Sequence, residues 1–135
     1  GLGDLNLIAI DDAVGGRVIV IDSETKTIHD QIDIGHDIRS LARYGQCIAA
    51  LRTGAKEIVW LGLNGNREIS ELQRWDLSPA GRWLSNPLDL SIDPNSGAVF
   101  VRSVLPCIFC DPSLNYNSTY LARPKDETLR KVCQP

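Results

Sequence analysis

Residues 7–22 read LIAIDDAVGGRVIVID, and residues 47–62 read CIAALRTGAKEIVWLG. The two stretches align without a gap at a spacing of 40 residues, from residue 7 to residue 47. Each contains an apolar run, a short turn that is polar or contains glycine, and a second apolar run. This order predicts a β-hairpin with a buried second strand. A repeated hairpin predicts an array of similar sheet units.

A third, weaker copy follows the first two. Residues 98–103 (AVFVRS) match residues 48–53 at a spacing of 50, which pairs Arg102 with Arg52. Spacings of 40 and 50 lie close to the period of four-stranded propeller blades, which is about 40–45 residues. The segments between the hairpins are expected to supply inner strands at 38–44 and 88–92.

Two further segments are predicted to be the outer strands of these units. Residues 27–34 are expected to place three isoleucines on one face, namely Ile28, Ile32 and Ile34. In residues 69–77 the same alternation places Ile69, Trp75 and Leu77 together. Period-two alternation is typical of a half-exposed strand.

The hairpin sequences resemble known repeats. Residues 17–35 (RVIVIDSETKTIHDQIDIG) are similar to the repeat of YVTN-type β-propellers, in which a V-x-V-I-D strand precedes a threonine-rich turn and an outer strand ending in glycine. Residues 86–101 (NPLDLSIDPNSGAVFV) resemble the inner hairpin of NHL and YWTD propellers, although the YWTD signature itself is absent from residues 99–102. The resemblance covers residues 5–104 and is specific for blade architecture, not for one family.

This resemblance implies an all-β chain of tandem four-stranded antiparallel blades that form an incomplete propeller of fewer than three blades. Blade repeats are expected over residues 1–104. Residues 105–135 are expected to form an irregular tail stapled by disulfides, with a short helix at 125–132.

The four cysteines are Cys47, Cys107, Cys110 and Cys133. Their even number predicts two structural disulfides, and three pairings are open. A zinc or redox site at Cys107 and Cys110 is disfavoured, because no second close ligand pair exists and a turn sequence follows.

The chain begins at Gly1 and contains no Met, so it is expected to be either a mature chain after cleavage or an excised fragment. The four cysteines and a glycosylation pattern favour an extracellular protein. The triplet Asn117-Ser118-Thr119 matches the N-glycosylation pattern. The formal charge of −3, with scattered basic residues, argues against nucleic-acid binding. No apolar run approaches the roughly 20 residues of a membrane span.

The sequence offers no catalytic constellation. Its two histidines are His29 and His36, and it lacks a G-x-S-x-G elbow, a phosphate loop and a metal-ligand set. We therefore expect neither an enzyme nor a cofactor or metal site.

Four residues are predicted to contact a partner. They are Trp75, Arg82 and Trp83, whose residue types are enriched at interface hot spots, and His36, which lies in a loop. Fewer than three blades cannot close a ring, so a protein partner or further copies of the chain are expected to complete the propeller. The sequence predicts a secreted, non-enzymatic interaction or assembly module. The alternatives are a propeller subunit of a periplasmic, quinoprotein-like redox enzyme and a carbohydrate-binding lectin.

Overall fold

The computed structural model describes residues 5–11, 15–78, 87–104, 117–122 and 127–134. The strands within these residues form three antiparallel sheets, called here A, B and C in chain order. Sheet A contains β1 (Leu5–Asp11), β2 (Gly16–Asp22) and β3 (Ile28–Asp33), in that order. Sheet B contains β4 (Ile38–Tyr44), β5 (Cys47–Arg52), β6 (Glu57–Leu63) and β7 (Ile69–Asp76). Sheet C contains β8 (Pro87–Ile92), β9 (Val99–Val104) and β10 (Asn117–Ala122), followed by helix α1 (Glu127–Cys133).

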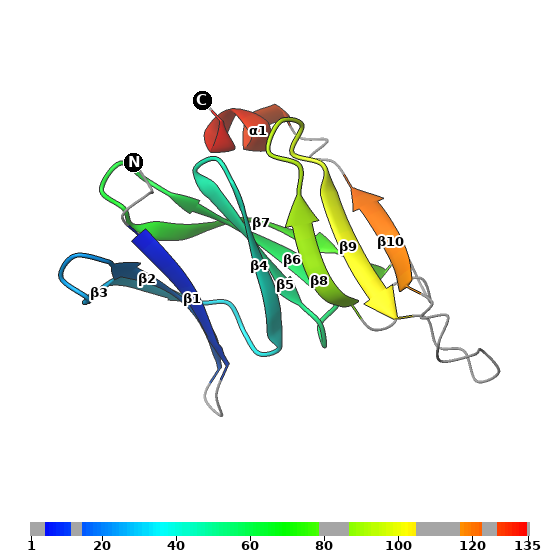
Figure 1. Ribbon diagram of the computed structural model, residues 1–135, viewed down its shortest axis with the longest axis horizontal. Coiled ribbons are helices and arrows are strands. Elements are labelled where there is room, and N and C mark those ends of the chain that lie inside the picture. The colour runs from blue at the N-terminus through cyan, green and yellow to red at the C-terminus, as the bar shows by residue number, and fades with distance from the viewer. Residues whose placement is uncertain (1–4, 12–14, 79–86, 105–116, 123–126, 135) are drawn as a thin grey trace.

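Sheet B lies between the other two sheets, and α1 packs beside the β4–β5 and β8–β9 turns (Figure 1). Strand β4 runs beside β8 of sheet C, and strand β3 approaches β7. The predicted all-β class is confirmed. Both predicted inner strands are present as β4 and β8, and both predicted outer strands are present as β3 and β7.

Both faces of sheet B are buried, which explains why its central strands are apolar almost without interruption. Because side chains alternate along a strand, each strand contributes to two cores. The A–B core joins alternate residues of sheet B to sheet A, and contains Val18, Val20, Ile34, Ile48, Ala50, Val59, Leu61, Leu63 and Ile69. The B–C core joins the opposite face to sheet C and α1, and contains Tyr44, Cys47, Ala49, Leu51, Ile58, Trp60, Leu77, Leu90, Val99, Val101, Leu129 and Cys133.

Each outer strand contains a β-bulge, and the bulge puts some of its side chains on the face opposite to the one predicted. Val20 pairs with Asp30 but Ile21 pairs with Ile28, so one extra residue of β3 lies between the two pairs. The bulge turns Ile28 to the face opposite Ile32, where its side chain is 58% exposed. The prediction that Ile28 shares a face with Ile32 and Ile34 is therefore wrong.

Strand β7 shows the same device at the equivalent position. Its register shifts between Trp60 and Leu61, which lie 40 residues after Val20 and Ile21. Ile69 consequently joins the A–B core, whereas Leu77 joins the B–C core and Trp75 packs against it. Their predicted common face is also wrong, because period-two reasoning cannot see a bulge.

The third repeat needs a shift of one residue. A bulge lies opposite Arg52 and Leu51 in β5, and the corresponding bulge in sheet C lies opposite Ser103 and Arg102. Arg102 is therefore equivalent to Leu51 and not to Arg52. A one-residue slip exchanges the two faces of a strand, so this correction decides which residues of β9 point outward.

The segment expected to be an irregular tail contains one strand that the sequence did not predict. Strand β10 pairs along its whole length with β9 and gives sheet C its third strand. The predicted helix at 125–132 is present as α1, with ends one or two residues away from those expected.

Candidate interaction surfaces

Charged side chains hold the segment that follows sheet A, residues 34–37, against sheet B. Glu57 accepts hydrogen bonds from both Arg52 and Arg74, and the Arg74–Glu57 distance is 2.7 Å. The Arg52 Nε donates to the carbonyl oxygen of His36 at 2.9 Å, and Arg74 Nη2 donates to that of Ile34 at 3.4 Å. We call this group the clasp, and it holds the linker between β3 and β4 against sheet B.

The outer strands are joined by two more contacts. The Asp30 carboxylate accepts the backbone N–H of Ile69 at 2.8 Å, and His29 Nε2 donates to the carbonyl oxygen of Asn66 at 3.0 Å. Asp30 interrupts the apolar pattern of β3, and this bond to the first residue of β7 explains why. Sheets A and B are therefore joined at their rims by polar contacts and between them by the A–B core.

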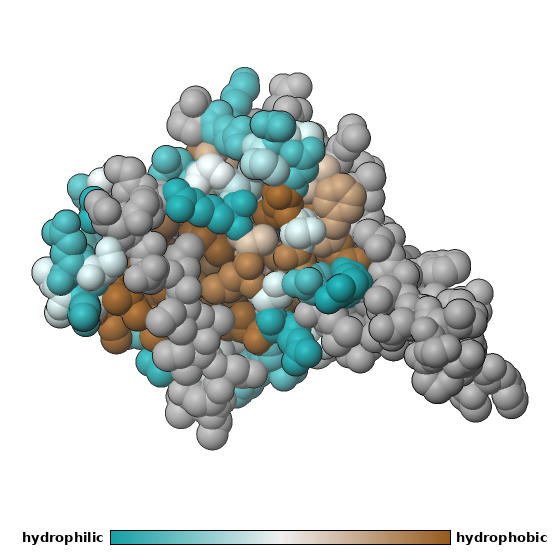
Figure 2. All heavy atoms as spheres, in the orientation of Figure 1, coloured by the Kyte–Doolittle hydropathy of each residue, from teal (hydrophilic) through white to brown (hydrophobic). Residues whose placement is uncertain are grey.

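The outer face of sheet A carries apolar side chains although it has one neighbouring sheet. Val18 and Val20 point into the A–B core, so the alternate residues of β2 and their β3 partners face away from sheet B. We call this surface the A face; it comprises Arg17, Ile19, Ile21, Ile28, Gln31 and Asp33. Figure 2 shows hydrophobic atoms at this end of the molecule, bordered by hydrophilic ones.

The outer face of sheet C is mostly polar. Leu90, Val99 and Val101 point into the B–C core, which leaves Asp89, Ser91, Phe100 and Arg102 facing away; we call these four residues the C face. Arg102 and Asp89 form an exposed ion pair at 3.5 Å, and Phe100 is 38% exposed. The C face and Leu90 line a shallow hollow of about 220 Å³.

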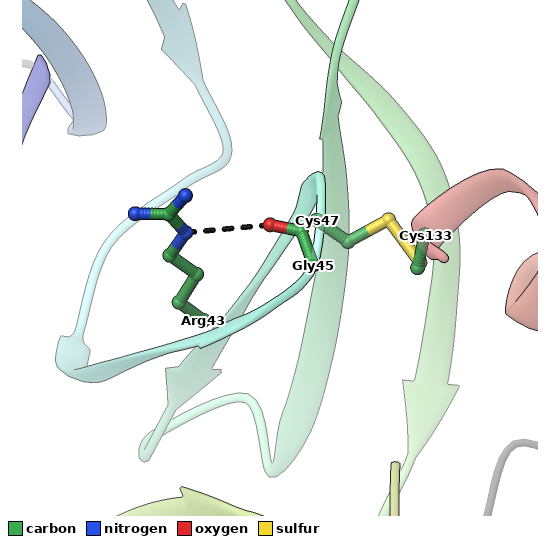
Figure 3. Close-up of a disulfide and its surroundings, with 4 residues drawn as sticks. All are labelled: Arg43, Gly45, Cys47 and Cys133. Atoms are coloured by element: carbon green, nitrogen blue, oxygen red, sulfur yellow. Dashed lines mark hydrogen bonds between the residues drawn. A yellow bond between two sulfur atoms is a disulfide. The ribbon is translucent and has the colours of Figure 1, made fainter. Parts of the chain in front are cut away.

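A disulfide joins Cys47, the first residue of β5, to Cys133, the last residue of α1 (Figure 3). The Gln46 N–H donates to the Cys133 carbonyl oxygen at 2.8 Å, and Gln134 Nε2 donates to the Pro94 carbonyl oxygen at 2.9 Å. Gly45 has a φ of 59° in the β4–β5 turn, and a Cβ on it would collide with the Cys133 carbonyl. Helix α1 thus closes one end of the B–C core.

Among the described residues, three carboxylates have a pKa below the ordinary value, each for a local reason. The Arg74 guanidinium, which hydrogen-bonds Glu71, lowers the pKa of that carboxyl and has its own pKa raised by the same bond. Backbone N–H groups of Glu24 and Thr25 lower the pKa of Asp22. Ser78 does the same to the pKa of Asp76, through its hydroxyl and its backbone N–H. Each of these carboxylates therefore stabilises a turn or an ion pair.

The structure describes two of the four predicted partner-contacting residues, Trp75 and His36. Trp75 packs against the B–C core with its ring 5.1 Å from that of Trp60, while His36 is exposed in the linker after β3. Arg82, Trp83, Cys107 and Cys110 lie outside the described residues. Asn117 is the first residue of β10, and its backbone pairs with Val104.

The sequence reasoning missed the clasp and both outer faces. Arg52 and Glu57 flank the β5–β6 turn, and their spacing could have indicated a cross-strand pair. Within residues that the structure describes, no group of three or more His, Cys, Asp or Glu side chains is placed to hold a metal. No helix in those residues is long and apolar enough to cross a membrane.

No protein-family model and no curated protein matches the chain. Solved structures do match it. The chain superposes on the β-propeller domain of Cps50 (Swd1) from Myceliophteria thermophila with a TM-score of 0.55 and 12% identity, covering 98% of this chain and 42% of that one. A chain from the S. cerevisiae complex of Dbp5 with Nup159, Gle1, IP6 and ADP gives a TM-score of 0.58 at 14% identity, over 90% and 32%. Hydrazine synthase from Kuenenia stuttgartiensis gives 0.52 at 11%, over 65% and 23%.

The chain has the fold of an incomplete β-propeller. It spans less than half the length of each of these solved chains. The superpositions show a shared fold. At identities of 11–14% they say nothing about the activity of this chain. The tandem propeller-type blades predicted from the sequence are thereby confirmed, and the Cys-containing C-terminal segment is disulfide-linked to the second blade.

Proposed function

We propose that this chain is a non-enzymatic interaction module of the extracellular space, whose blades pack against further β-sheets supplied by other chains or copies. One observation carries the proposal. Sheet B is buried on both faces, whereas sheets A and C each have one neighbouring sheet within the described residues.

A propeller closes its ring with about four to eight blades, and the described residues form three sheets. End sheets that lack a neighbour leave strand edges and side chains open to association. Propeller folds supply a rigid scaffold for such contacts, and the A and C faces lie at opposite ends of the array (Figure 1).

The disulfide supports an extracellular location. Disulfides persist in oxidising compartments and are rare in the cytosol. The Cys47–Cys133 bond joins two segments 86 residues apart, and a reducing compartment would oppose its formation. We further propose that Asn117 carries a glycan and that the blades are of the YVTN type suggested by residues 17–35.

Native size tests the proposed function. A tagged copy of the 135-residue chain is produced in cells that secrete proteins, and its mass is measured in the untreated medium and after purification. We expect complexes larger than the 14.9 kDa chain in at least the untreated medium. A chain that is retained inside the cell, or that migrates as a compact monomer in both samples, would refute the proposal.

A carbohydrate-binding role is the second candidate, and the hollow on the C face favours it. Phe100 offers an apolar ring, while Asp89 and Arg102 offer an acceptor and donors for hydroxyl groups. Calorimetric titration with a panel of neutral sugars tests this role, with Phe100→Ala as the variant expected to abolish binding.

The redox-subunit alternative has weaker support. The match to hydrazine synthase concerns the fold, and one fold hosts many activities. The described residues contain no cluster that would hold a metal. A coloured cofactor that co-purified with the secreted chain would favour this alternative over the interaction module.

A further inference from the structure

The repeat gives every strand a position within a four-stranded blade. Sheet B is complete, with β4 as its inner strand and β7 as its outer strand. The bulges that β3 and β7 share make β2 and β3 equivalent to β6 and β7. The bulges that β4 and β8 share make β8 and β9 equivalent to β4 and β5. Within the described residues, sheet A therefore has no inner strand and sheet C has no outer strand.

Strand β1 forms the edge of sheet A at which the inner strand is missing. Its equivalent in sheet B, β5, pairs with β6 along one edge and with β4 along the other. Strand β1 pairs with β2 from Leu5 to Asp11, and no other described strand pairs with it, although β4 of sheet B lies close by (Figure 1). The backbone N–H and C=O groups of an antiparallel strand point alternately to its two sides. The edge of β1 therefore presents backbone groups with which another strand can pair.

Two equivalent leucines show the effect of the missing strand. Leu41 of β4 pairs with Ala50 and Leu90 of β8 pairs with Val101, so the two leucines lie at the same distance from the bulges. Leu90 faces sheet B, whose inner strand β4 runs beside β8, and is 5% exposed. Leu41 faces sheet A, packs against the A–B core and is half-buried. The same residue is thus covered where the neighbouring sheet has an inner strand and partly open where that strand is missing.

The open edge of sheet C is a weaker candidate. The strand missing there is the outer one, next to β10. In the complete sheet B, the outer strand β7 has exposed side chains at four of its eight positions, against two of seven in the inner strand β4. An inner strand therefore buries more of its side chains, and its burial drives binding more strongly.

We propose that the edge of β1 binds an extended segment of a partner chain, which pairs antiparallel with β1 and completes sheet A as its inner strand. The inference rests on the proposed interaction role and names its site and the form of the partner. Such strand addition takes its affinity from main-chain hydrogen bonds and its specificity from alternate side chains. Every strand in the described part of the chain already belongs to a sheet, so the partner is another polypeptide and not a second copy.

Strand β4 indicates which side chains the segment should carry. Its residues Ala42 and Tyr44 pack with Leu90 in the B–C core. The equivalent residues of a strand beside β1 would point toward sheet B, where Leu41 is half-buried. We therefore expect apolar side chains at these two alternate positions of the segment.

A peptide with the sequence of β4, IRSLARY (residues 38–44), is the probe for this site, because it has the side chains of an inner strand. The fluorescently labelled peptide is titrated into the purified 135-residue chain, and its anisotropy is measured. We expect saturable binding. A control peptide with serine at the positions of Ala42 and Tyr44 should bind at least about tenfold more weakly, because it lacks the apolar groups that would cover Leu41.

Hydrogen exchange and substitutions locate the bound peptide. Binding should slow the exchange of the β1 amides and leave those of β10 unchanged. Leu41→Asp should weaken binding by at least about tenfold, because the peptide would bury its charge. Leu41→Ala, which is milder for the fold, should weaken binding less, and Phe100→Asp on the C face is the matched control that should leave binding unchanged. Thermal unfolding monitors the fold of each variant.

Several outcomes would overturn the inference. They are a failure of the peptide to bind, protection of β10 in place of β1, and equal losses of binding in the Leu41→Asp and Phe100→Asp variants. Self-association of the purified chain that protects β1 would make a second copy the occupant and would also overturn it. Complexes in secretion medium without peptide binding would overturn the strand site and leave the interaction role standing. Peptide binding at β1 by a chain that stays monomeric in that medium would support the site and refute the role.

Discussion

At the scale of single residues, Glu57 is the carboxylate that holds the clasp together. Its carboxylate lies between Arg52 and Arg74, and its side chain is 18% exposed. We expect Glu57→Gln to lower the free energy of unfolding by about 1–3 kcal/mol, because Arg52, whose side chain is 16% exposed, loses its carboxylate partner and Arg74 keeps only Glu71. Urea denaturation followed by circular dichroism measures this loss.

Asp89→Asn supplies the control for that substitution. It removes the partner of Arg102 from a pair whose side chains are 56% and 53% exposed. Exposed pairs contribute little, so the loss should stay within about 0.5 kcal/mol. Similar losses in the two variants would show that the clasp does not fasten sheet A.

The lowered carboxyl pKa values predict sensitivity to acid. Glu71, Asp22 and Asp76 each have a folded-state pKa below the usual values near 4, so at pH around 4 the unfolded chain binds more protons. Their contribution is complete above the unfolded pKa and is lost as pH falls through the folded one. In Glu71→Gln the fall in stability between about pH 5 and pH 3 should be shallower than in the wild type. Identical melting-temperature profiles for the two proteins across that range would contradict this.

At the scale of elements, α1 is held to sheet B by a bond that spans most of the chain. A cross-link between residues 86 apart should stabilise the fold by about 4 kcal/mol, chiefly by restricting the unfolded chain. We expect Cys133→Ser to cost about this much in denaturant unfolding. The neighbouring Val132→Ser changes an exposed residue of the same helix and should cost less than about 0.5 kcal/mol. Comparable losses from both would point to helix packing as the source.

The elements also show where sequence reasoning succeeds. The apolar runs of β2, β5 and β6 were predictable because a strand buried on one or both faces leaves a plain hydrophobic pattern. The faces of β3 and β7 were not, because a bulge adds one residue without changing the local composition. Strand β10 was not predicted, because its sequence has no clear alternation of apolar and polar residues. It is a strand because it pairs with β9, and no local sequence pattern encodes that contact. Cysteine pairing was undetermined for the same reason.

The candidate surfaces illustrate the same limit. The clasp joins Arg52 to Arg74 across three strands, and its target carbonyls lie in a third segment, so only the folded chain brings them together. The C face depended on the register of the third repeat, which the sequence alignment placed one residue away.

At the scale of the whole molecule, the burial of each strand predicts how readily its backbone hydrogen bonds open. Strands β5 and β6 are enclosed by both cores, whereas β3 is exposed along most of its length. We expect amide hydrogens of β5 and β6 to exchange only through global unfolding and those of β3 to exchange faster by local opening. Hydrogen exchange followed by mass spectrometry resolves the two. Equal protection of β3 and β6 would show that sheet A opens only with the rest.

The bond between Cys47 and Cys133 makes residues 47–133 a covalent ring, and sheet A lies entirely outside it. A single backbone cut inside the ring opens it without releasing a fragment, because the disulfide still joins the two pieces. Sheet A and β4 precede Cys47 in the chain, so the ring does not include them. The A–B core and the clasp hold sheet A, and backbone pairing with β5 holds β4. A cut between β3 and β4 therefore leaves sheet A held by non-covalent contacts alone, whereas a cut between residues 47 and 133 leaves both pieces covalently joined.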